Sequence, residues 1–172
     1  MNTKGLKLKK GGLDTIVAYI VVMLPLLYVL IYMVATIYHF SVQQYMNQVV
    51  KEATVMASTY GEITTNHEDY IRNKLSGILE KDANGVADCT IQYYIKKFNE
   101  ATGTVGPIQG PYSLKSLPYV NKADIIGIYV ESVQQSILGS VTSFGIFSKN
   151  EEYTGGLKYS SYREEIIRNY AP

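Results

Sequence analysis

The sequence contains very little cysteine: Cys89 is the only one in 172 residues. One cysteine cannot form a disulfide within the chain, so packing or neighbouring molecules must hold the fold together. The net charge is also small, at +1, from 16 basic and 15 acidic residues. This balance gives no reason to expect nucleic acid as a partner.

Sequence motifs for catalysis and metal binding are missing as well. The chain has no phosphate-binding glycine loop, no nucleophile elbow, no paired-cysteine metal motif and no His-Glu-x-x-His helix. Residues 66–69 (Asn-His-Glu-Asp) could form a metal cluster, but consecutive side chains on a helix point in different directions. Two acidic pairs could act as catalytic carboxylates: Asp124 with Glu131, and Glu164 with Glu165. The sequence does not give the distance between their carboxylates, and most such residues are solvated. We therefore expect no enzyme, no cofactor and no metal site.

Charge is absent from a long stretch near the N-terminus. No Asp, Glu, Lys or Arg occurs between Asp14 and Lys51. Residues 15–40 would extend about 39 Å as a helix, more than the hydrocarbon core of a bilayer at about 30 Å. The sequence thus predicts one transmembrane helix, at about residues 15–38, surrounded by membrane lipid. The residues before it form a basic leader with four lysines: Lys4, Lys7, Lys9 and Lys10.

The basic leader predicts the orientation. Lysines on the N-terminal flank favour retention in the cytoplasm, which places the C-terminal domain outside by the positive-inside rule. The apolar run is longer than that of a cleavable secretory signal, so ordinary signal peptidase is not expected to remove it. We expect a single-pass protein of the cytoplasmic membrane. Pro25 predicts a bend within the helix, and Tyr38 with His39 is expected at the outer interface.

The predicted helix does not stop at the bilayer. Apolar residues continue at steps of three and four, which is the spacing of one helix face, and polar residues occupy the other positions. We therefore expect three segments: a leader at 1–12, a long helix at 13–60, and an exported domain at 61–172. The apolar stripe of the second half of the helix consists of Val42, Tyr45, Met46, Val49, Val50, Ala53 and Met56.

The exported domain is predicted to be α+β. Thr65 as N-cap with Glu68 forms a capping-box pattern, which indicates a helix at about 66–82 that ends in a turn at 82–85. Three glycines and three prolines within residues 101–121 favour an irregular surface loop. Residues 164–172 have no assigned element. Alternating β-branched and aromatic residues predict a small, mostly antiparallel sheet of three to four strands, at residues 89–98, 124–135, 141–147 and 156–163.

The start of the chain resembles a known class of export signal. Lys9-Lys10-Gly11-Gly12, followed at once by the apolar helix, is similar to leaders that a prepilin-type peptidase cuts after glycine. The resemblance implies a cut between Gly12 and Leu13 that leaves the helix in place. The run at 23–27, Met-Leu-Pro-Leu-Leu, looks like that of the TadE-type pseudopilins of tight-adherence pili. Residues 124–130 resemble a late strand of that family, which implies a pilin-like fold.

One position departs from the family pattern. Pilin-like helices usually carry a glutamate five residues after the cut, where this chain has Val17. Asp14 is the only acid nearby, and a carboxylate there can pair with a freed Leu13 amine or with a neighbouring subunit's amine. Asp14 can equally act as a helix N-cap, and the two roles are compatible.

Two functions are compatible with these features. The first is a pilin-like structural subunit, major or minor, of a type IV or Tad-like pilus, which assembles with copies of itself or other pilin-like subunits and contributes to adhesion at the cell surface. The second is an unassembled, signal-anchored extracellular binding or sensing protein, in which the apolar stripe packs on its own domain. For the first, the expected assembly contacts are Asp14, Pro25, Val42, Met46, Val49, Ala53 and Met56.

Overall fold

The computed structural model of this chain describes residues 10–134 and 157–168. These residues form two compact units, Met1–His39 and Phe40–Pro172, each of which is described here by itself. In the first unit every described residue belongs to helix α1, which extends over Lys10–Tyr60. The helix therefore begins at Lys10 and includes Gly12, earlier than the predicted start at residue 13. It stays helical through Pro25.

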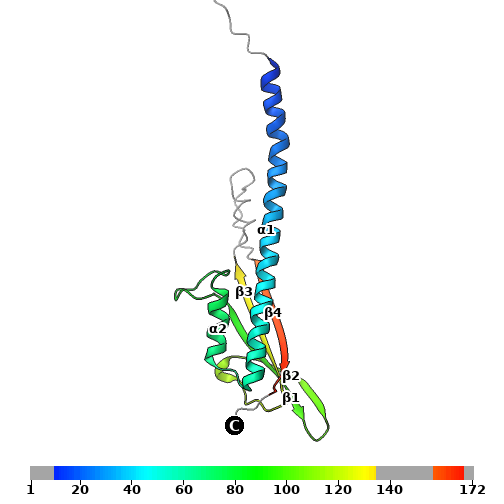
Figure 1. The fold of residues 1–172 in the computed structure, drawn as a ribbon, viewed down its shortest axis with the longest axis vertical. Helices are drawn as coiled ribbons and strands as arrows, with labels where there is room; N and C mark the ends of the chain where they lie inside the picture. The colour runs from blue at the N-terminus through cyan, green and yellow to red at the C-terminus, as the bar shows by residue number, and fades with distance from the viewer. Residues whose placement is uncertain (1–9, 135–156, 169–172) are drawn as a thin grey trace, which may run out of the picture. The chain divides into compact units, whose positions relative to one another are not determined.

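The second unit contains the rest of α1, a short helix and a four-stranded sheet (Figure 1). Helix α2 covers Thr65–Leu75. The strands are β1 (Thr90–Asn99), β2 (Thr104–Tyr112), β3 (Ile125–Gln134) and β4 (Leu157–Ile166). Their order in the sheet is β2-β1-β3-β4, and every neighbouring pair is antiparallel. The α+β class with a small antiparallel sheet is confirmed.

One face of the sheet makes the core. Alternate residues of β1 and β3 are buried there, because successive side chains of a strand point to opposite faces. Buried side chains of α1 and α2 belong to the same apolar cluster. The two helices thus cover one face of the sheet, and neither of these described helices covers the other face. The largest fully buried side chains of this core include Met46, Ile71, Leu75, Tyr93, Ile95, Ile126 and Ile128.

Strand β2 lies where we predicted an irregular loop, so that prediction was wrong. Its sequence, Thr-Val-Gly-Pro-Ile-Gln-Gly-Pro-Tyr, contains two prolines and two glycines. Proline is tolerated at a sheet edge, where its missing N–H does not interrupt a ladder. β2 is an edge strand, and its pairing with β1 has two register shifts. Gly110 has a φ of 132°, a conformation that glycine adopts readily.

Helix α2 differs from the prediction at both ends. Its N-cap is Thr64 rather than Thr65, and the third helical residue is His67 rather than Glu68. The helix ends at Leu75, well before residue 82, because Ser76 and Gly77 are poor helix formers. The turn predicted at 82–85 is confirmed: Asp82 Oδ1 accepts hydrogen bonds from the backbone N–H of Asn84 (2.8 Å) and of Val86 (3.2 Å).

The remaining strands agree with the prediction in part. β1 and β3 match predicted strands within one residue at each end. β4 extends to Ile166, past the predicted end at 163, because residues 164–166 pair with the start of β3. The strand predicted at 141–147 lies outside the described residues.

Candidate functional site

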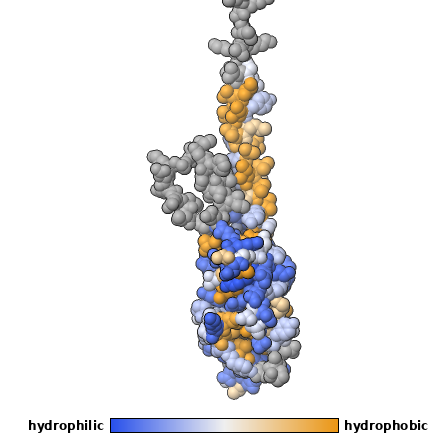
Figure 2. Space-filling view, turned by 90° about the vertical axis from the view of Figure 1, so that its left-hand side faces the viewer, coloured by the Kyte–Doolittle hydropathy of each residue, from blue (hydrophilic) through white to orange (hydrophobic). Residues whose placement is uncertain are grey.

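The first unit is an exposed apolar helix. Most of its large apolar side chains are more than half exposed, from Val17 at 52% to Tyr19 at 69%. Figure 2 shows hydrophobic residues along this stretch of α1. Within the described part of the chain, one helix is long and apolar enough to cross a membrane, and it is this one. Such a surface is unfavourable in water and favourable in lipid or against other apolar helices.

The predicted processing site lies at the start of α1. A methyl group added to Gly12 would have no atom within 4 Å, so this position is sterically open. The backbone of Leu13 and Asp14 is helical. Their side chains lie outside the described part of the structure, and so the two roles of Asp14 stay predictions.

The apolar stripe in the second half of α1 packs inside the chain's own domain and does not form the expected assembly surface. Val42, Met46, Val49 and Ala53 are buried in the core of the second unit, against the sheet of the same chain. Met56 is partly buried and packs against this core. These side chains are covered before any second subunit arrives. We therefore correct their role from assembly contacts to core residues, because the domain's own sheet buries the stripe.

Two of the residues considered for a metal site, His67 and Glu68, have structural partners. Nδ1 of His67 accepts a hydrogen bond from the backbone N–H of Thr64 at 3.1 Å, and burial lowers the pKa of His67. The carboxylate of Glu68 accepts a hydrogen bond from the buried hydroxyl of Tyr93 at 3.1 Å. Burial, followed by the Glu68 charge, raises the pKa of Tyr93. Among the described residues, no three His, Cys, Asp or Glu side chains gather closely enough to hold a metal ion.

Cys89 is buried beside α2. The guanidinium of Arg72 donates to the Cys89 carbonyl at 3.0 Å and lies 3.9 Å from its Sγ. Burial raises the pKa of the thiol, and the Arg72 charge offsets only part of this effect. A protonated, covered thiol is a poor nucleophile. Cys89 thus serves packing in this fold.

Asp124 organises one end of the sheet. Its side chain is 1% exposed and forms an ion pair of 2.8 Å with Lys97. It also accepts hydrogen bonds of 2.8 Å from the backbone N–H groups of Phe98 and Asn121. Burial alone would raise the pKa of Asp124, but these hydrogen bonds outweigh it and the pKa is lowered. This carboxylate is a structural clamp between β1 and the turn before β3. The backbone carbonyl of Asp124 in addition accepts a hydrogen bond of 2.9 Å from the N–H of Ile167, just past the end of β4.

The uncovered face of the sheet carries a tyrosine pair. The rings of Tyr94 and Tyr162 meet edge to face, with centroids 5.6 Å apart and planes at 90°. Tyr162 lies over Gly127, where an added methyl group would come within 2.5 Å of its hydroxyl oxygen. The Tyr162 hydroxyl donates to Glu164, whose carboxylate also pairs with Lys96 at 2.7 Å. Burial and the Glu164 hydrogen bond raise the pKa of Tyr162.

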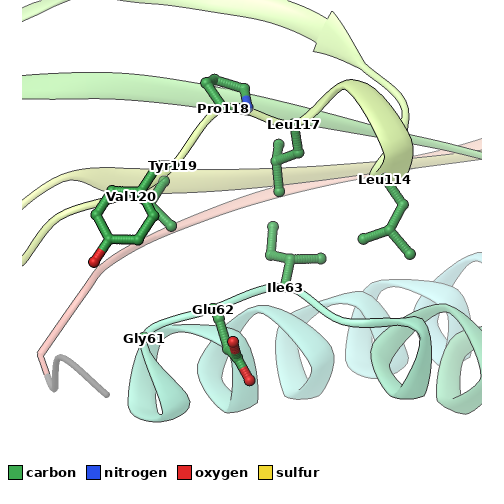
Figure 3. A pocket seen from close by; sticks show the side chains of 8 residues that line it. All are labelled: Gly61, Glu62, Ile63, Leu114, Leu117, Pro118, Tyr119 and Val120. Atoms are coloured by element: carbon green, nitrogen blue, oxygen red, sulfur yellow. The ribbon is translucent and has the colours of Figure 1, made fainter. Parts of the chain in front are cut away.

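A small pocket lies where the α1–α2 connection meets the segment before β3. Its volume is about 200 Å³. Figure 3 shows Ile63 pointing towards Leu117 and Leu114, with Tyr119 at one side. Polar and apolar atoms line it in nearly equal parts, so the pocket suits a small group that has both kinds of surface. Its lining residues are Gly61, Glu62, Ile63, Leu114, Leu117, Pro118, Tyr119 and Val120.

Comparison with protein-family models, with curated proteins and with solved structures finds no match to this chain. The candidate sites therefore rest on the geometry of this chain alone.

Two structural features were not predicted from the sequence. The Asp124 clamp depends on backbone N–H groups from distant segments, and the tyrosine pair depends on the register of β1, β3 and β4. No pattern within one segment reveals either feature.

Proposed function

We propose that this protein is a pilin-like structural subunit, held in the cytoplasmic membrane by α1 before it joins a type IV or Tad-like filament. One observation carries the proposal: the first half of α1 is apolar and exposed, while the second half is already buried in the chain's own domain. The exposed half is therefore the part of the helix that has apolar surface left for other subunits. The leader and the Met23–Leu27 run support the same reading.

Outside the membrane, the exposed half of α1 must be shielded from water by other subunits. Burial of apolar surface contributes about 25 cal/mol per Å², so a few hundred Å² of helix surface per neighbour gives several kcal/mol before the costs of association. In the membrane, where lipid is as apolar as leucine, helix association depends instead on packing and on interhelical hydrogen bonds. Moving the helix from lipid into a filament exchanges one apolar environment for another.

The first experiment measures the N-terminus of the mature protein by mass spectrometry. We expect Leu13 as the first residue, in protein from membranes and from sheared cell-surface material. Gly12→Val provides the matched variant, because the position is sterically open and the fold should not change. The variant should keep Met1 and disappear from the sheared fraction. An intact Met1 in the wild-type protein, with nothing in the sheared fraction, would overturn the proposal.

The second experiment separates assembly from folding. A charge at Val49 cannot do so, because Val49 lies in the domain's own core. Leu27→Asp changes the exposed half instead, where the side chain is 55% exposed. We expect the variant to keep the unfolding midpoint of the domain and to be lost from membranes and filaments alike.

The pocket of Figure 3 favours the second function, a signal-anchored binding protein that never assembles. Ile63→Trp and Leu117→Trp would fill it. If the protein instead binds a small ligand through this pocket and does not assemble, both variants should lose that binding, and the sheared fraction should contain neither the wild type nor the variants. For the structural subunit, neither change should affect the amount of sheared protein.

A further inference from the structure

The exposed half of α1 has one face with hydrogen-bonding groups. Val21, Pro25, Tyr28, Tyr32 and Thr36 follow one another at steps of four, three, four and four, so they lie along one side of the helix. The opposite side carries mainly apolar side chains, together with Tyr19 near the start of the span. A hollow there is lined by Ile20, Met23, Leu24, Leu26, Leu27 and Leu30.

Two hydroxyl groups on this face lack partners. Tyr28 and Tyr32 are 55% and 53% exposed, and no residue in the described part of the chain hydrogen-bonds to either hydroxyl. Thr36 differs, because its hydroxyl donates to the Tyr32 carbonyl at 2.8 Å. Tyr28 lies about 20 Å along the helix from Thr15 and about 15 Å from Tyr38. It is therefore too deep in the span for its side chain to reach either headgroup region.

The same face contains an unused acceptor. Pro25 has no N–H, so the carbonyl of Val21 lacks its normal helical donor. Helical carbonyls point towards the C-terminus, which directs this one to the level of Pro25. Tyrosine side chains on a helix lean towards the N-terminus, which brings the Tyr28 hydroxyl back towards the same level. Donor and acceptor thus occur at similar depth on one face, in a medium that penalises both when unpaired.

We propose that two copies of this chain pair in parallel in the membrane through the Val21–Pro25–Tyr28–Tyr32 face, with Tyr28 of each copy donating to the freed Val21 carbonyl of the other. This inference rests on the proposed function, since it identifies which side of α1 the subunits use. A second copy is the occupant because it supplies the missing donor and the missing acceptor together. Lipid tails supply neither.

The test is oxidative cross-linking of the full-length protein in host membranes, with Cys89 replaced by alanine. Val21→Cys places a thiol on the proposed face. Met23→Cys is the matched control, because it lies about 3 Å away along the axis and on the opposite side. We expect cross-linked dimers from Val21→Cys and few or none from Met23→Cys. Equal yields would overturn the proposal, because they indicate that lipid covers both faces alike.

Removing the hydroxyls gives an independent measurement. Interhelical hydrogen bonds in membranes contribute about threefold each to association. Tyr28→Phe with Tyr32→Phe removes the two Tyr28–Val21 bonds of the pair and should weaken pairing about ninefold, measured by energy transfer between labelled copies in liposomes. Tyr19→Phe is the control, since Tyr19 lies on the other side of the helix; it should have no effect. An unchanged association constant in the double variant would overturn the proposal.

The sheared fraction separates this inference from the proposed function. If filaments contain the protein but Val21→Cys does not cross-link, the pairing face is wrong and the structural role stands. If Val21→Cys cross-links selectively and no filaments form, the pair stands and the proposed function fails.

Discussion

The two halves of α1 have similar apolar residues but different surroundings. In residues 16–37 the large apolar side chains are mostly exposed, whereas Met46, Val49 and Val50 in the second half are fully buried by their own sheet. The difference lies in what the rest of the chain provides. The sheet of the same molecule buries the apolar side chains in the second half of α1. Only the first half therefore has exposed apolar side chains that lipid or another subunit can cover. Apolar periodicity identifies a contact face but does not identify its partner.

The largest effect should come from a charge in the buried half. Val49→Asp would bury an unpaired carboxylate in the core, and we expect a loss of more than about 4 kcal/mol, enough to unfold the domain. The measurement is thermal unfolding followed by circular dichroism in detergent. Val55→Asp is the control, because Val55 lies on the same part of α1 and is 37% exposed; it should unfold near the wild-type temperature. Similar losses in both variants would contradict the assignment of the stripe to the core.

The second prediction concerns the Asp124 clamp, which belongs to the domain alone. Asp124→Asn keeps the size of the side chain but removes its charge beside Lys97, and we expect a loss of about 2–4 kcal/mol. Glu100→Gln, at an exposed site, should cost almost nothing. Chemical denaturation of the domain measures both. An Asn variant as stable as the wild type would show that the ion pair does not hold this end of the sheet.

The same clamp predicts a pH dependence. The pKa of Asp124 is lowered in the folded protein, so its stabilisation is complete above the unfolded value of about 3.9. It is lost as the pH falls below that value and through the lower folded pKa. The wild type should lose stability over this range, and Asp124→Asn should lose less. Parallel loss in the two proteins would assign the acid sensitivity to other carboxylates.

The third prediction concerns the uncovered face of the sheet. Gly127→Ala would place a methyl group against the Tyr162 ring, and overpacking of this kind costs about 1–3 kcal/mol. Tyr162→Ala removes the ring that the new methyl group would contact. The double variant should therefore lose less stability than the sum of the losses of the two single variants. A double-mutant cycle measures this coupling. Additive losses would indicate that Gly127 is required for its backbone rather than for the tyrosine.

The sequence predicted the long helix, β1, β3 and most of β4 because their patterns are local. It missed β2, since Pro107 and Pro111 indicate a loop unless the strand is known to lie at an edge. It also placed Met46 and Val49 in an assembly surface, because periodicity cannot distinguish the chain's own sheet from another subunit. The sequence alone indicates a solvated surface position for Asp124, and only the contact between distant segments shows that it is buried. Long-range contacts thus account for each of these differences.

The smallest expected effect concerns a hydrogen bond on the polar side of the second half of α1. The hydroxyl of Tyr70 on α2 donates to the Glu52 carboxylate on α1 at 2.5 Å, and this bond raises the pKa of Tyr70 to about 12. Tyr70→Phe should lower the free energy of unfolding by about 0.5–1 kcal/mol near neutral pH. Tyr60→Phe, at an exposed site, is the control and should change nothing. Because the folded pKa is raised, the contribution of Tyr70 is complete below pH 10 and is lost as the pH rises towards 12. If Tyr70→Phe and the wild type are equally stable at neutral pH, the hydrogen bond between Tyr70 and Glu52 does not stabilise the contact between α1 and α2.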